Sequence, residues 1–152
     1  MKYEQVLTEL EQTARDHVDA TAAMDAVVAT LKNRVPDYTW VGIYLMAGDE
    51  LVLGPYRGKP SPHTRIPLGR GICGAAATEK QTIIVDDVNA DPRYLACSIE
   101  TKSEIVVPIM DGSRVLGEID IDSDRTAAFG DDDRRLLEQV AAWLAPRLTG
   151  KS

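Results

Sequence analysis

The two cysteines of this chain are the residues best suited to carry covalent chemistry. Cys73 follows the glycine-rich run Gly69–Gly71, where a short helix is expected to begin, and Cys97 lies in a polar stretch before a strand. A helix N-terminus lowers a thiol pKa and favours the reactive thiolate. A free cysteine among glycines and alanines can equally be a buried packing residue, so both interpretations of Cys73 stay open. Cys97 has fewer apolar neighbours and is the stronger candidate for function.

Acidic side chains are the second set of residues that could do chemistry. The strand-like run Gly117–Ser123 places Glu118, Asp120 and Asp122 on one side, because strand side chains alternate. Such a row is either a solvated outer face, which commonly carries charge, or a site that binds a cation such as an ammonium group. In a site of that kind, one carboxyl could also keep its proton through a raised pKa and donate it.

The pairing of the two strands at 104–109 and 115–122 decides which acids meet. Their alternating apolar residues are expected to face the core: Ile105, Val107, Ile109, Val115, Ile119 and Ile121. Both strands keep these residues on one face only if the hairpin loop has an odd number of residues, most simply the three residues Asp111–Ser113. Glu104 would then lie directly opposite Asp120. Since like charges opposed across a sheet are unfavourable, that pair would need a functional reason.

Charge and composition exclude several functions. The chain has 152 residues and a formal net charge of -7, which repels phosphate backbones and anionic lipids, so nucleic acids and membranes are not expected partners. The N-terminus lacks a signal peptide and no window is apolar enough for a membrane span, so the chain is expected to be cytoplasmic. Besides the cysteines, the soft metal ligands are His17 and His63, and the glycine-rich run lacks the dinucleotide spacing. Neither a metal nor a cofactor is therefore expected.

Hydrophobic periodicity predicts the elements that must position these groups. Apolar residues recur at three- and four-residue steps up to residue 31, with a break near Asp19, which indicates two consecutive helices. Further along the chain, the pattern predicts a hairpin (40–45 with 51–53), a short helix (72–80), three more strands (82–85, 104–109 and 115–122) and a final helix (131–144). This order predicts one α+β domain over residues 1–152, with a mostly antiparallel sheet of five or six strands and N- and C-terminal helices packed on it.

Aromatic residues supply candidates for the wall of a pocket. Trp40, Tyr44 and Tyr56 could line a pocket, and Trp40 and Tyr44 are candidate substrate-binding residues, although aromatic residues on strands more often pack in the core. Trp143 on the final helix is expected in the core or at a subunit contact, which leaves a homodimer open.

Several segments together resemble the GAF-domain family of free methionine-R-sulfoxide reductases. The segments are Trp40–Leu45, Leu53–Lys59, Arg65–Gly74, Asp86–Val88, Ala96–Cys97, Ser103–Pro108 and Asp120–Ser123. The similarity runs over nearly the whole chain. A GAF fold alone mostly serves ligand sensing, whereas the two cysteine motifs joined to the acidic strands are much more specific.

The resemblance implies reduction of free L-methionine-R-sulfoxide to methionine. Cys97 matches the family's catalytic cysteine, which attacks the sulfoxide sulfur and becomes a sulfenic acid. Cys73 matches a cysteine that resolves this acid to a disulfide, which thioredoxin then reduces. Glu104, Asp120 and Asp122 match the family's substrate-pocket carboxylates, so the resemblance favours a site over a solvated face.

The chain departs from the family pattern at one position. Many members carry a third cysteine about ten residues before the one that Cys73 matches, and His63 stands near that place here. Recycling through an internal disulfide would therefore depend on Cys73. Two other functions stay open: a non-catalytic GAF sensor that binds a small ligand in the same pocket, and a redox switch in which the two cysteines form a regulatory disulfide.

Overall fold

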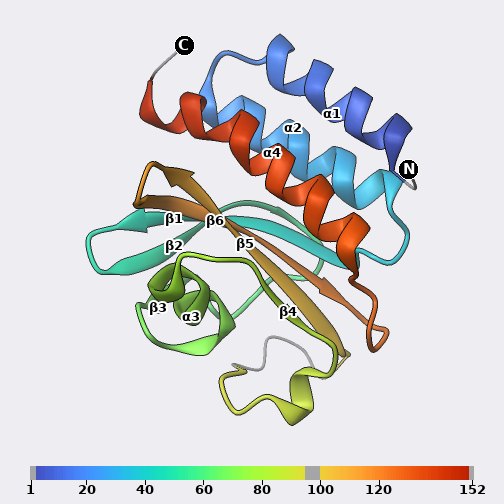
Figure 1. Cartoon of the computed structure of the whole chain (residues 1–152), viewed down its shortest axis with the longest axis vertical. Coiled ribbons are helices and arrows are strands. Elements are labelled where there is room, and N and C mark those ends of the chain that lie inside the picture. Colours follow the sequence, from blue (N-terminus) through green and yellow to red (C-terminus); the bar gives the residue numbers. More distant parts are fainter. Residues whose placement is uncertain (1–2, 95–99, 151–152) are drawn as a thin grey trace.

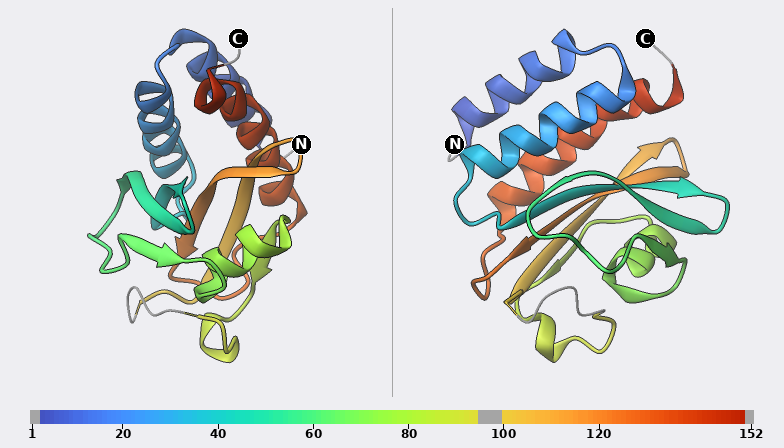
Figure 2. Two further views of the ribbon diagram at one scale, coloured as in Figure 1. Left: turned by 90° about the vertical axis from the view of Figure 1, so that its left-hand side faces the viewer. Right: turned by 180° about the vertical axis from the view of Figure 1, so that it is seen from behind.

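A six-stranded antiparallel sheet separates two layers of helices in the computed structural model, which describes residues 3–94 and 100–150. Helices α2 (Ala20–Arg34) and α4 (Asp131–Thr149) lie on one face of the sheet, with α1 (Glu4–Asp16) packed across them, and α3 (Gly71–Glu79) covers the other face (Figures 1 and 2). The predicted α+β class is confirmed. Among the described residues, no helix combines the length and the apolar character that a membrane crossing needs.

The strands follow the order β3-β2-β1-β6-β5-β4, so that β1 and β6 lie at the centre. Their bounds are β1 Trp40–Ala47, β2 Glu50–Arg57, β3 Arg65–Pro67, β4 Ile83–Val85, β5 Ser103–Asp111 and β6 Arg114–Ser123, and a 3-10 turn spans Val88–Ala90. The predicted strands did not include the short strand β3, whose three residues lie in a stretch with prolines at 60, 62 and 67. Every predicted helix and strand is present, several of them longer than expected.

The predicted break between the first two helices is confirmed at Asp19. This residue caps α2, because its carboxylate accepts a hydrogen bond from the backbone N–H of Ala22 at 2.9 Å. The buried stripes of α2 and α4 then pack against the apolar face of the central strands, where Val41, Ile43 and Ile119 are fully buried, and α1 packs on these two helices.

The hairpin between β5 and β6 differs from its prediction. Asp111 pairs with Arg114, so the turn has two residues rather than three, and the odd residue is instead a bulge at Leu116. The bulge turns Val115 away from the helices and packs it on the opposite face, which corrects its predicted place in the main core. The acids of β6 still lie on the predicted face of the sheet, but the pairing of β6 with β5 is shifted by two residues.

The new register changes which acids oppose one another. Glu104 pairs with Asp122, whereas Asp120 pairs with Val106, so the predicted Glu104–Asp120 pair is wrong. A two-residue turn plus a bulge gives the same parity as a three-residue loop, and for that reason the sequence pattern cannot tell them apart.

A buried carboxylate joins the N-terminal helix, the start of the sheet and the final helix. The Asp133 side chain, 3% exposed, accepts hydrogen bonds from Tyr3 Oη at 2.8 Å, Tyr38 Oη at 2.7 Å and the Gly130 backbone N–H at 2.9 Å. Burial and the neighbouring Asp133 raise the pKa of both tyrosines well above the ordinary value. Asp133 therefore receives hydrogen bonds from neutral hydroxyls and stabilises the start of α4.

We expect Asp133→Ala to lower the free energy of unfolding by about 2–4 kcal/mol, because it leaves two buried hydroxyls without an acceptor and removes the helix cap. The neighbouring Asp132→Ala is the control, with an expected change within about 0.5 kcal/mol. Urea denaturation of the two variants measures the difference. Equal stability of the two would show that the buried hydrogen bonds contribute nothing net.

Candidate active site

Two central strands present facing rows of side chains on the α3 side of the sheet. On β1 the row contains an aromatic ring at each end and a glycine between them, and each member pairs with an acid of β6: Trp40 with Asp122, Gly42 with Asp120, and Tyr44 with Glu118. Glu104 of β5 joins the row from the other side, opposite Asp122. Regular β-pairing alone therefore gathers four carboxylates and two aromatic rings on one face.

The acid row is buried rather than solvated. Glu118 is 0% exposed, Asp120 3%, Asp122 4% and Glu104 5%. Helix α3 and the segments around β3 and β4 cover this face, with Ile72, Ile66 and Val85 in its apolar lining. The interpretation of the row as a solvated outer face is thus wrong, and the carboxylates occupy a low-dielectric pocket.

Burial sets the protonation of these acids. It raises the pKa of Glu118 and Asp122 well above the ordinary range, and the charge of Asp120 raises both further. The pKa of Asp120 is also raised by burial, although hydrogen bonds with Glu104 and Cys73 oppose the shift. Ionised acids this close repel one another strongly at low dielectric, so part of the row holds protons near neutral pH.

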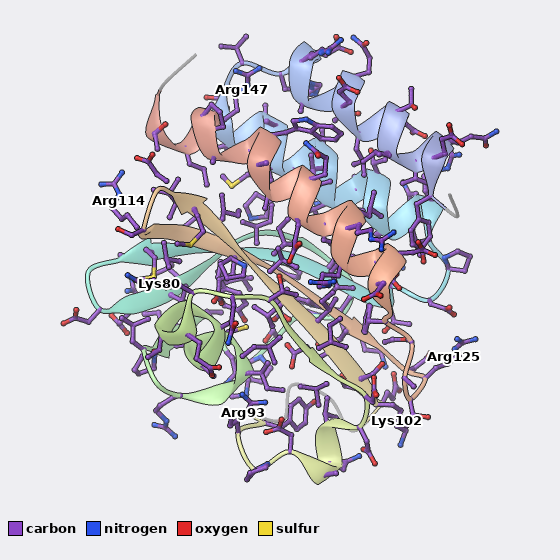
Figure 3. All side chains as sticks on the ribbon, viewed as in Figure 1. Lys80, Arg93, Lys102, Arg114, Arg125 and Arg147 are labelled. Atoms are coloured by element: carbon purple, nitrogen blue, oxygen red, sulfur yellow. The ribbon has the colours of Figure 1, made fainter. Side chains whose placement is uncertain are left out.

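Basic side chains do not neutralise the row. No ion pair joins Glu118, Asp120 or Asp122 to a basic residue in the part of the chain that the structure describes. Arg114 and Arg125, for example, point away from the body of the molecule (Figure 3). Among the described residues, Glu118, Asp120 and Asp122 thus have no basic partner, and protons or a bound cation can relieve their repulsion.

Cys73 points into the same pocket from the first turn of α3. Its thiol is free and 4% exposed. Burial raises its pKa well above the ordinary value, and Asp120, Glu118 and Glu104 raise it further. Of the two open interpretations of Cys73, a thiolate stabilised by the helix N-terminus does not fit this environment, because burial and the acids favour the neutral thiol.

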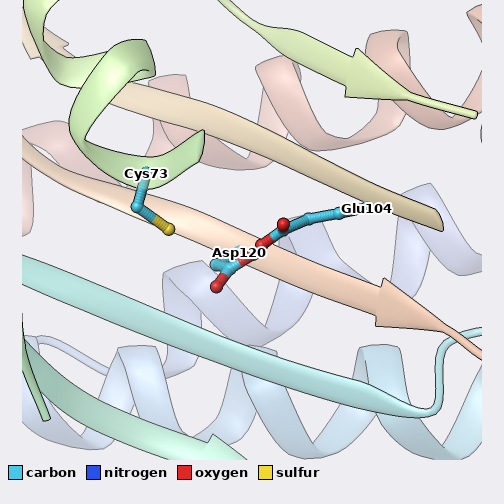
Figure 4. A group of neighbouring side chains, drawn as sticks. All are labelled: Cys73, Glu104 and Asp120. Carbon is cyan, nitrogen blue, oxygen red and sulfur yellow. The ribbon is translucent and has the colours of Figure 1, made fainter. Parts of the chain in front are cut away.

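Three of these side chains converge from three different elements. Figure 4 shows Cys73, Glu104 and Asp120 extending towards one another from α3, β5 and β6. Cys73 Sγ and one carboxylate oxygen from each acid all lie within 4.8 Å of one another. A cavity of about 20 Å³ adjoins them, lined also by Tyr44, His63, Ile66, Gly71 and Ile72.

The aromatic residues shape the rest of the pocket. The Trp40 ring stacks on Tyr56 with 5.7 Å between ring centroids, and its indole N–H donates to the Lys59 carbonyl at 2.9 Å. A Cβ at Gly42 would lie 2.3 Å from the Trp40 ring, so only glycine fits beneath it. Tyr44 Oη donates to the His63 carbonyl at 2.7 Å and thereby holds the 58–64 loop over the cavity.

A larger hollow of about 210 Å³ opens beside Trp40 and Asp122. Its lining comes from three segments: Thr39 and Trp40, Lys59 to Ser61, and Glu100 and Thr101, together with Asp122 and Asp124. Lys59 Nζ contacts Glu100 Oε1 at 2.8 Å at the exposed rim. Asp122 lines this hollow and pairs with Glu104, which lines the smaller cavity, so neighbouring acids of the row line the two spaces.

Most of the predicted site residues meet in this pocket. They are Cys73, Glu104, Asp120, Asp122, Trp40 and Tyr44. Cys97 lies outside the described residues. Sequence reasoning placed Glu118 on the acid row without proposing it for the site, although its parity with Asp120 was a usable signal. His63 was not among the proposed site residues, although the resemblance put it near the place of a third family cysteine, and it lines the smaller cavity.

Comparison with known proteins matches the sequence and the fold of this chain to a family. Residues 8–148 match the model of the GAF domain. A free methionine-R-sulfoxide reductase of Escherichia coli is 38% identical over 137 residues, which cover 86% of this chain and 82% of that protein. The crystal structure of the free methionine-R-sulfoxide reductase of Neisseria meningitidis in complex with its substrate is 40% identical and superposes with a TM-score of 0.92, over 97% of this chain and 88% of that one. The chain belongs to the GAF-domain family of free methionine-R-sulfoxide reductases.

A further member of this family is a eukaryotic protein. The free methionine-R-sulfoxide reductase of Saccharomyces cerevisiae is 44% identical over 114 residues, which cover 72% of this chain and 63% of that protein. The resemblance inferred from the sequence motifs is thus confirmed at the level of the family.

The raised pKa of Glu118 gives a testable pH dependence of stability. The folded state keeps a proton on Glu118 that the unfolded chain releases above about pH 4.3, so wild-type stability falls as pH rises from there through the folded-state pKa. Glu118→Gln carries no charge at any pH and escapes this loss. We expect it to be about 1–3 kcal/mol more stable than wild type at pH 8, with the difference closing near pH 4.

Urea denaturation at the two pH values measures this effect. Asp49→Asn, in the exposed β1–β2 turn, is the matched control and should show no gain that depends on pH. A Glu118→Gln variant that is less stable than wild type at both pH values would mean that the carboxylate has a favourable partner.

Proposed function

We propose that this chain reduces free L-methionine-R-sulfoxide to methionine. The observation that carries the proposal is the row of four buried carboxylates beside a tryptophan wall and a thiol. The names of the relatives from Escherichia coli and Neisseria meningitidis, and the substrate complex of the latter, support the same reaction.

In this proposal the substrate occupies the larger hollow, and its sulfoxide group points towards the acid row. The smaller cavity, about 20 Å³, has room for a water molecule but not for an amino acid. The excess negative potential of the row attracts the α-ammonium group, which a methionine residue within a peptide lacks. Trp40 supplies an apolar surface for the substrate's methylene groups.

The chemistry divides between an acid and a nucleophile. The Cys97 thiolate attacks the sulfoxide sulfur while a carboxyl of the row protonates the sulfoxide oxygen, which weakens the S=O bond. The oxygen leaves as the hydroxyl of a Cys97 sulfenic acid, and methionine is released. Carboxyls with raised pKa values suit the role of proton donor near neutral pH.

Recycling in this proposal needs the second thiol. Cys73 attacks the sulfenic acid, its proton leaves with the hydroxyl as water, and the resulting disulfide is reduced by a dithiol such as thioredoxin. Because acids and burial raise the pKa of Cys73, its attack requires that a neighbouring carboxylate accept the thiol proton or that the pocket open.

Substrate preference tests the role of the acid row. We expect the free R-epimer to be reduced, and the S-epimer and peptide-bound methionine sulfoxide to be much poorer substrates. Asp120→Asn should keep the fold and lower kcat/KM by at least about 100-fold, the usual contribution of a general acid. The control Asp49→Asn should retain wild-type turnover. Equal rates on free and peptide-bound sulfoxide would contradict the ammonium contact.

The two cysteines should differ in single-turnover experiments. Cys97→Ser should release no methionine, whereas Cys73→Ser should release about one methionine per chain and stop as a sulfenic acid, because only the resolving step is lost. Mass spectrometry after one equivalent of substrate should find a Cys73–Cys97 disulfide in the wild type. Normal recycling of Cys73→Ser with thioredoxin would show that Cys73 only packs in the core and does not resolve the sulfenic acid.

A further inference from the structure

The convergence of Cys73, Glu104 and Asp120 has the composition and spacing of a metal site. The cysteines and histidines alone are too few and too scattered in the sequence to predict a zinc site. The fold adds two carboxylates to Cys73, and one donor atom from each side chain lies within 4.8 Å of the other two. We propose that Cys73, Glu104 and Asp120 bind a divalent transition-metal ion with the ligand preferences of zinc.

The spacing is close to what such an ion requires. Zinc bonds of about 2.0–2.3 Å to oxygen and sulfur place neighbouring ligands of a tetrahedron roughly 3.4–3.8 Å apart. The three donor atoms are at most 4.8 Å apart, so small rotations of the side chains close the site without movement of the sheet. The adjoining cavity of about 20 Å³ has the size of a single water molecule or ion.

A second, independent observation points to a cation at this place. Asp120 is 3% exposed, and its Oδ1 atom has no hydrogen-bond partner among the described residues. Glu118, fully buried beside it, has no hydrogen-bond partner for either oxygen within residues 3–94 and 100–150 apart from the Cys73 thiol. Buried polar atoms rarely stay unpartnered, and acids without partners at low dielectric strongly favour a compensating positive charge.

The donor set selects the type of metal. One thiolate with two carboxylates suits zinc and its neighbours in the transition series, whereas magnesium and calcium prefer oxygen ligands alone. Three protein ligands leave a fourth position open towards the cavity, which His63 also lines. Metal binding replaces the Cys73 thiol proton, and this proton appears in solution.

An ion at this position would occupy the groups that the proposed function assigns to catalysis. It would neutralise the acids that attract the ammonium group and hold the Cys73 sulfur that resolves the sulfenic acid. Metal and free methionine sulfoxide should therefore compete, with inhibition reversed by a chelator. This consequence depends on the proposed function, whereas metal binding itself does not.

Cobalt(II) is the probe for the site, because a cobalt–thiolate bond gives a charge-transfer absorption in the near ultraviolet. Reduced, chelator-treated protein should show this band and bind one ion per chain, and zinc should displace the cobalt. Cys97→Ser should keep both properties. Cys73→Ser should lose the band and weaken zinc binding by more than the 10–100-fold that loss of an outer-shell partner costs.

Further variants keep the result interpretable. Asp120→Asn should weaken zinc binding by a similar factor, and Asp49→Asn should not change it. If Cys73→Ser fails to fold, Asp120→Asn and Glu104→Gln decide the question. A band that survives in Cys73→Ser and disappears in Cys97→Ser, or a wild type that binds no zinc at micromolar concentration, would overturn the site. One bound zinc in a protein without sulfoxide reductase activity would keep the site and reject the proposed function.

Discussion

The burial of four carboxylates on one face of the sheet is the constraint on which the rest of the structure depends. Acids within a low-dielectric pocket oppose folding, because their ionised forms lose hydration and repel one another. The opposite face of the same strands offsets this cost, since Ile105, Ile119 and Ile121 are fully buried against the helices. Strand alternation lets one segment serve both purposes, with an apolar residue and an acid in turn.

The helices that cover the main core also fix the strands that carry the site. Asp133 joins Tyr3, Tyr38 and the start of α4 immediately before β1, so the position of Trp40 is anchored from the helical side. The bulge at Leu116 has a comparable role at the far end of β6, because it lets a tight turn coexist with acids on the correct face. The pocket is thus held by backbone pairing and core packing rather than by ion pairs.

Much of this arrangement could be predicted from the sequence, and the exceptions have physical reasons. Parity follows from alternation of apolar and acidic residues, so the acids were placed on the right face. Register depends on the turn and on the bulge, which parity does not distinguish, so Glu104 was paired with the wrong acid. The state of Cys73 stayed undecided because local sequence indicates a helix N-terminus but not the acids that β5 and β6 bring to its thiol. The small cavity closed by His63 depends on a long-range contact with Tyr44, which no local pattern encodes.

The same electrostatic imbalance accounts for both ligands that the pocket is proposed to bind. A row of four acids can lower its free energy by taking up protons, by binding one ammonium group at the Asp122 end, or by binding a divalent ion at the Cys73 end. Each choice leaves a different charge on Asp120, which lies between the two ends and hydrogen-bonds with both Glu104 and Cys73. Binding of a cation at either end favours ionised neighbours and so lowers the number of protons that the row holds. A monovalent ammonium group leaves a proton in the row, whereas a divalent ion displaces it, and this difference in charge separates a substrate from an inhibitor in one pocket.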